Sequence, residues 1–248
     1  MSITAANAFR YEEVQQLILL KTHHALNWDM VQLIDMFTLG QRWLKDQYKN
    51  KPSYRYPVIT WDLLPPSGAS QYHPHLQAIL TPHHYPGNLE NWRRAAFDYH
   101  RDHGRNFFTD FISVHDMLGL TVRHGSAVAI ATLVNSKKEN EVVVMAKEMN
   151  KDYLQLLYAV LRSYIDDMQL YSFCLSMALT PFADDPSTDR YYTPVKALPV
   201  FTRVVTRGKL SDTRSDISSL ELFTFSNVNS DPFSLIQRIQ ESVLTRVS

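Results

Sequence analysis

The feature that most constrains the fold is a periodic run of apolar residues in the second half of the chain. Its members are three or four positions apart: Leu154, Tyr158, Leu161, Ile165, Met168, Ser172 and Leu175. Such spacing places side chains on one side of a helix, and Asn150 precedes the run as a candidate N-cap. We therefore predict a long helix over about 150–175 that lies across a sheet, with a dimerisation helix as the alternative. Cys174 would then be a buried residue of an apolar helix.

Segments rich in β-branched and aromatic residues predict the sheet. They lie at 55–64, 75–81, 120–134, 141–147, 198–206 and 219–226. The second should be antiparallel to the first, and His124-Gly125-Ser126 should form a hairpin turn within the third. Further helices are expected at 9–26, at 27–44 behind an Asn27 cap, at 88–103, and after Asp231-Pro232.

Together these elements predict an α/β or α+β fold, a mostly antiparallel central sheet flanked by helices, similar to an α-β-α sandwich. Residues 1–178 would form a helical N-terminus plus the sandwich. Residues 179–248 would form a strand-strand-helix extension packed on the same unit. Between them, 180–197 is acidic and proline-rich, as expected of an exposed connection.

Composition narrows the function classes. The 248 residues carry 25 basic and 25 acidic side chains, so charge does not support nucleic-acid binding, and neutrality favours self-association. The single cysteine excludes an internal disulfide, and neither a secretory signal nor a membrane-spanning apolar run is found. A reducing, cytoplasmic location is expected. Phosphate-loop, dinucleotide and nucleophile-elbow motifs are missing, so no cofactor is predicted.

Eight of the ten histidines fall between His73 and His124. Imidazoles and the nearby carboxylates can together hold zinc or iron, but no ligand motif is recognisable, and whether metal binds here is unknown. Surface or core histidines and a pH sensor are the other interpretations.

Three segments resemble the signal-binding domain of LuxR-type quorum-sensing regulators. They are YPVITWDLLPPSG at 56–68 followed by HYPGNLENW at 84–92, GLTVRHGSAVAIATLV at 119–134, and NKDYLQLLYAVLRSYIDDM at 150–168. The resemblance covers about 55–170, without the family's helix-turn-helix. It implies a sandwich that holds an acyl-homoserine lactone, with Tyr85 and Trp92 at the ligand. Trp61 joins them because of its place on a predicted strand.

From the resemblance and the aromatic cluster we predict a non-enzymatic regulatory or sensory protein that binds a small apolar ligand or a protein partner. A self-assembling structural protein and a metal-dependent enzyme using the 73–124 histidines are the alternatives.

Overall fold

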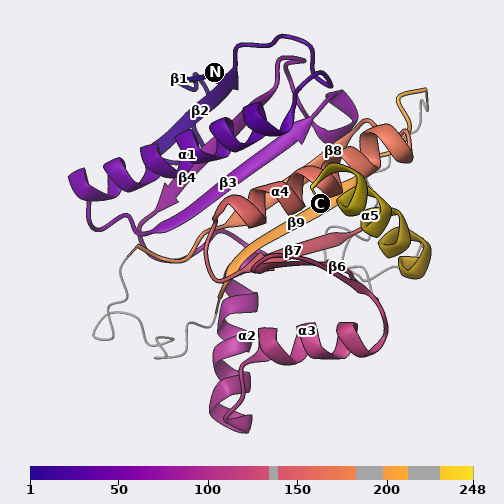
Figure 1. Ribbon diagram of the computed structural model, residues 1–248. Helices are drawn as coiled ribbons and strands as arrows, with labels where there is room; N and C mark the ends of the chain where they lie inside the picture. The colour runs from indigo at the N-terminus through magenta and orange to yellow at the C-terminus, as the bar shows by residue number, and fades with distance from the viewer. Residues whose placement is uncertain (134–138, 183–197, 212–229, 248) are drawn as a thin grey trace.

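One continuous antiparallel sheet organises the molecule. The computed structural model describes residues 1–133, 139–182, 198–211 and 230–247. Within them nine strands pair in the order β1-β2-β4-β3-β8-β9-β7-β6-β5, and every neighbouring pair is antiparallel. The predicted fold class is confirmed (Figure 1).

The strands are β1 (Ser2–Ala5), β2 (Val14–Leu20), β3 (Tyr56–Leu63), β4 (His75–Thr81), β5 (Thr121–His124), β6 (Ala127–Ala131), β7 (Val142–Ala146), β8 (Phe173–Ala178) and β9 (Val200–Thr206). The helices are α1 (Met30–Asn50), α2 (Asn88–His103), α3 (Phe107–Met117), α4 (Lys151–Arg162) and α5 (Pro232–Arg246). A short 3₁₀ turn, Pro65–Ser67, follows β3.

The two faces of the sheet are covered unequally. Helices α1, α4 and α5 lie along one face and bury the larger hydrophobic core against it (Figure 1). Helices α2 and α3 pack on the other face, against β6, β7, β9 and one end of β3 and β8. The part of this second face that β2, β4 and β3 form has no helix over it in the described chain.

Apart from the edge strand β5, the sheet consists of two halves with the same topology. In the first half, β1-β2-α1-β3-β4 pair in the order β1-β2-β4-β3; in the second, β6-β7-α4-β8-β9 pair in the order β6-β7-β9-β8. The halves meet where β3 pairs antiparallel with β8. Because α1 and α4 lie on the same face, a two-fold axis between β3 and β8 relates the halves approximately.

The prediction of a helix over 9–26 is wrong, because this segment contains β2. The apolar residues Val14 and Ile18 fit a helical spacing, but they are also an even number of positions apart and so share one face of a strand. Both enter the core beneath α1, while Gln15 and Leu17 point to the other face. Strand pairing with β4 decides between the two readings of the pattern.

The single long helix over 150–175 is also wrong. Helix α4 is capped by Asn150 as expected, but it ends at Arg162 and continues only as a π-helical turn over Ser163–Asp167. The chain then enters β8, where Phe173, Leu175 and Met177 face the core with a period of two. Cys174 therefore lies on a strand and is only half-buried.

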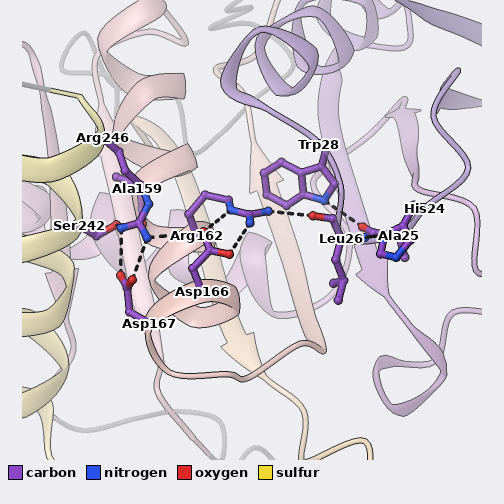
Figure 2. A network of polar contacts seen from close by, with 10 residues as sticks. All are labelled: His24, Ala25, Leu26, Trp28, Ala159, Arg162, Asp166, Asp167, Ser242 and Arg246. Carbon is purple, nitrogen blue, oxygen red and sulfur yellow. Dashed lines mark hydrogen bonds and ion pairs between the residues drawn. The ribbon is translucent and has the colours of Figure 1, made fainter.

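A polar network anchors this π-helical turn (Figure 2). Arg162 pairs with Asp166, and its Nη1 donates to the Leu26 carbonyl at 2.9 Å. From α5, Arg246 binds Asp167 with an Nη2–Oδ1 distance of 2.8 Å. The network ties α4 to α5 and to the connection before α1, so the three helices form one layer behind the sheet.

Several other predictions are confirmed. Helix α2 spans the expected residues, Gly125 has a φ of 52° in the β5–β6 hairpin, and the Asp231 side chain caps α5. Helix α1 begins later than expected, at Met30, with Asp29 and Gln32 forming a capping box. The exposed connection predicted for 180–197 lies largely outside the described residues, and the strand predicted at 219–226 lies entirely outside them.

The segment after residue 178 joins the same body, since β9 lies between β8 and β7 and α5 packs on α4. Among the described helices, none combines the length and the apolar content that crossing a membrane requires.

Candidate functional site

The uncovered sheet face carries a compact set of polar side chains. Strand registers align them in rows across the strands. One row contains Leu17, Gln77, Thr60, Ser176 and Arg203. In the next row Leu19 pairs with His75, and Asp62 pairs with Cys174. The β3–β4 pairs end at Thr60 and Gln77, and Asp62 beyond them lies close enough to His75 for the two side chains to interact electrostatically.

His75 has a defined tautomer. Its Nδ1 lies 2.8 Å from the backbone carbonyl oxygen of His73. A carbonyl oxygen can only accept, so Nδ1 carries the proton and Nε2 keeps its lone pair in the neutral ring. Within the described residues Nε2 makes no hydrogen bond, and His75 is half-buried at the wall of a cavity. This arrangement presents an imidazole nitrogen suited to act as a nucleophile or a base.

Gln77 is oriented by a relay of hydrogen bonds. Backbone N–H of Tyr11 donates to Gln15 Oε1 at 2.6 Å, and Gln15 Nε2 donates to Gln77 Oε1 at 2.6 Å. Gln15 itself is buried, and its two hydrogen bonds are partly buried. Because the Gln77 oxygen is occupied, its NH₂ group is left to donate toward the groove beside His75.

A carboxyl group lies next to the histidine. Burial raises the pKa of Asp62, although a hydrogen bond from Cys174 and the nearby His75 and Arg207 act in the opposite direction. A raised pKa means that the Asp62 carboxyl keeps its proton to a higher pH, and a neutral carboxyl does not repel an incoming anion.

Two lobes extend from this centre. One is a cavity of about 530 Å³ that runs over β3, β8 and β9 to the first turns of α2; its apolar wall includes Val58, Ile79, Leu89, Trp92 and Phe201. The other, of about 620 Å³, lies over β2 and the β1–β2 connection, and its walls include Asn7, Phe9, Leu17, Leu19, Gln71 and His75. Tyr11 and Gln77 line both lobes, so Gln77 stands where they meet, and His75 lies beside it in the second lobe.

The three predicted ligand residues are not brought together. Trp92 lines the first lobe, with the Arg203 guanidinium 5.8 Å from its ring centroid. Trp61 points into the opposite core, where its ring contacts Trp28 and Phe173. Tyr85 is fully buried beneath Tyr56, and its hydroxyl donates to the Leu179 carbonyl. Only Trp92 is therefore placed to touch a ligand in this groove.

The histidines between 73 and 124 are likewise dispersed over the segment before β4, β4 itself, the loop after it, α2, α3 and β5. His115 illustrates a structural role: Nδ1 donates to the Phe111 carbonyl at 2.8 Å, and Nε2 accepts from Leu133 N–H at 3.3 Å. In the part of the chain that the structure describes, no three His, Cys, Asp or Glu residues gather closely enough to hold a metal ion.

In the sequence, His75 was one member of a histidine cluster interpreted as metal ligands, as surface or core histidines, or as a pH sensor, and Gln77 was not singled out. A signal was available, because residues 75 and 77 are two positions apart on the strand predicted at 75–81 and must share one of its faces. What the sequence did not show was which face would remain uncovered.

Comparison with known proteins supports a particular fold class. A solved structure described as a uridylyltransferase superposes with a TM-score of 0.77 at 12% identity, covering 100% of this chain and 86% of that one. An ADP-glucose phosphorylase from Arabidopsis thaliana, solved with bound ADP-glucose, gives 0.68 at 14% identity over 92% of this chain and 72% of the other. A GALT-like protein from the same plant gives 0.70 at 14% identity, covering 97% and 83%. No family model and no curated protein matches the sequence.

These comparisons correct the predicted function. At 12–14% identity they establish the fold, and that fold is the one used by a uridylyltransferase and an ADP-glucose phosphorylase. The prediction of a non-enzymatic, quorum-sensing-like regulator is therefore wrong, and the self-assembly and metal-enzyme alternatives gain no support. None of the structures named here is described as a LuxR-type domain, so that resemblance stays a prediction.

Proposed function

We propose that this protein transfers a nucleoside monophosphoryl group from a nucleotide-sugar type of donor to a phosphate-bearing acceptor, with His75 as the covalent nucleophile. The observation that carries the proposal is the geometry of His75: its Nδ1–H is bound to the His73 carbonyl, which leaves Nε2 with its lone pair, and the ring lines the second lobe beside Gln77.

In the first step, the Nε2 lone pair attacks the α-phosphorus of the donor. A phosphorus–nitrogen bond forms, the phosphorus–oxygen bond to the leaving phosphate breaks, and that phosphate departs with the electron pair. The positive charge that develops on the imidazole is stabilised through Nδ1–H by the His73 carbonyl. In the second step an acceptor oxygen attacks phosphorus, and the phosphorus–nitrogen bond breaks to restore His75.

The neighbouring groups suit a phosphoryl centre. Gln77 offers its NH₂ as a donor to a phosphoryl oxygen, and such donors favour the charge that develops in the transition state. The lobe over β2 contains Phe9 and Tyr11, which are 84% and 76% exposed and could stack on a planar base. The first lobe, over β3, β8 and β9, then remains for the other half of the donor or for the acceptor.

The test is intact-protein mass spectrometry after incubation with UDP-glucose or ADP-glucose. We expect the mass to increase by one nucleoside monophosphoryl group, and we expect the adduct to be acid-labile, as a phosphoramidate is. His75→Gln should form no adduct and should transfer at least about a thousandfold more slowly than the wild type.

His83→Gln provides a matched control, because His83 is an exposed histidine in the loop after β4. It should form the adduct like the wild type. An adduct that persists in His75→Gln, or no adduct with either donor, would refute the proposal.

A further inference from the structure

A pair of histidines lies immediately behind the proposed nucleophile. His73, at the entrance to β4, and His23, after β2, approach each other through their Nδ1 atoms at 2.8 Å, and their rings meet edge to face. The Nε2 of His73 contacts the carbonyl oxygen of Leu20. These contacts join the end of β2 to the start of β4.

The hydrogen-bond chemistry assigns every proton in this pair. The Leu20 carbonyl can only accept, so Nε2 of His73 must carry hydrogen, and Nδ1 of neutral His73 must accept from Nδ1–H of His23. The pair can carry one extra proton, on His23. A second proton would place two N–H donors against each other, and the contact would be lost.

The pair acts on His75 through the backbone. The carbonyl of His73 is the group that holds Nδ1 of His75. Its direction is limited by Pro74, since a residue before proline is confined to extended conformations. Leu20 N–H donates to the Pro74 carbonyl at 3.3 Å, so the segment is tied to β2 through both its side chain and its backbone.

We propose that His23 and His73 form a proton-sensitive positioning pair that holds His75 in its attacking tautomer and releases it when both imidazoles are protonated. The inference rests on the proposed function, because it concerns the nucleophile of that reaction. Neither histidine touches the reacting atoms, and His23 is a positioning residue.

Other ionisable groups lie on the elements that adjoin the pair. The charged or titratable groups on the elements packed around it are Lys21, His24, the amino terminus of Met1 with its partner Asp35 on α1, Tyr11, Tyr72, Asp62 and His75. The substitutions below leave all of these unchanged.

The first experiment records the imidazole nitrogens of His75 by NMR, without substrate, at a pH where His75 is neutral. Wild-type protein should show the Nδ1–H tautomer alone. His23→Phe removes the donor to His73 and should give a mixture of tautomers. His23→Asn should restore the wild-type spectrum, because an amide can donate from a position close to that of Nδ1.

The second experiment follows nucleotidyl transfer as a function of pH. His23→Phe should lower kcat by about tenfold to a hundredfold, as expected for a misplaced reacting group. His23→Asn should match the wild type near pH 8. On acidification, kcat of His23→Asn should fall with the slope expected for protonation of one group, His75. The kcat of the wild type should fall more steeply with decreasing pH. An asparagine amide can turn to accept from protonated His73, so it keeps the contact.

His83→Phe is the control for replacing a histidine by phenylalanine, and it should change neither the tautomer nor the rate. Unchanged His75 tautomers in His23→Phe, or superimposable pH profiles for the wild type and His23→Asn, would overturn the proposal. Because the NMR comparison needs no substrate, it remains decisive even if no donor labels the wild-type protein, in which case the transfer proposal alone fails.

Discussion

The two halves of the sheet share a topology but differ in chemistry. On the open face, β4 of the first half presents His75, Gln77 and Ile79, while the matching strand β9 of the second half presents Phe201, Arg203 and Val205. Phe201 is buried against Trp92 and Phe108, and Arg203 Nε donates to the buried Glu141 at 2.9 Å. The first half therefore carries the proposed reaction, and the second provides a wall.

The difference follows from where the chain goes after β4. It forms α2 and α3, which pack back over β6, β7 and β9 rather than over β2 and β4. A strand covered by helices needs apolar residues on both faces, whereas an uncovered strand can keep polar groups hydrated or in contact with a ligand. The two halves of the sheet thus differ in the residues they present because helices cover one of them and not the other.

Apart from loss of His75 itself, Gln77→Leu should reduce the activity assigned to the first half more than any other substitution considered. It removes the NH₂ donor beside the nucleophile, and kcat should fall by about a hundredfold. Gln15→Leu leaves the Gln77 amide in place without its orienting partner and should cost less, about tenfold. Steady-state kinetics with a nucleotide-sugar donor measure both. Wild-type kcat in Gln77→Leu would show that the first half is not the reacting half.

Trp92→Leu probes the wall that the second half forms with α2. The Trp92 side chain lines the first lobe and packs on Phe201, so KM should rise by about tenfold while kcat changes little, as expected when uniform binding is lost. Trp61→Phe is the matched control, because Trp61 is buried on the opposite face. It should alter thermal stability and leave KM unchanged. Equal KM values for Trp92→Leu and the wild type would exclude this lobe from substrate binding.

Asp62→Asn should have the smallest effect, on stability. Burial raises the pKa of Asp62 in the folded state, so folding disfavours its ionised form. The wild type is therefore as stable as its variant below the pKa that Asp62 has in the unfolded chain. It loses stability as the pH rises through the higher pKa that Asp62 has in the folded protein. The variant should therefore melt a few degrees above the wild type at pH 7 and together with it near pH 3.

Thermal melts between pH 3 and pH 8 provide the measurement for Asp62→Asn. The exposed Asp46→Asn on α1 serves as the control and should show no pH-dependent gain. A gain of Asp62→Asn that is independent of pH would argue against burial of the charge as its cause.

Local signals predicted much of the fold. The β3 and β4 segments, the Gly125 hairpin, the Asn150 cap and the Asp231-Pro232 helix start were all recognisable, because each depends on neighbours in sequence. The helix predicted beyond Arg162 rested on spacings of three and four, but pairing with β3 and β9 makes the end of that run the strand β8. The error at 9–26 arose from an ambiguous spacing. Apolar residues spaced by four, such as Val14 and Ile18, fit both a helix and one face of a strand, and only pairing partners distant in sequence decide between them.

The candidate site was harder to predict for the same reason. His75 and Gln77 were visible as residues of one strand, but Asp62, Cys174 and Gln15 reach them only through pairing of β3, β8 and β2. Trp92, from the resemblance, and Trp61, from its predicted strand, were assigned to one ligand site, yet they lie on opposite faces of the sheet.

By itself, then, the sequence determined that this chain would form an antiparallel sheet backed by amphipathic helices, since alternation, capping and turn residues act over a few positions. The tertiary structure alone decided which sheet face stays open and which side chains meet there. That choice depends on the packing of α2 and α3 against strands that lie well beyond them in the chain, and no local pattern encodes it.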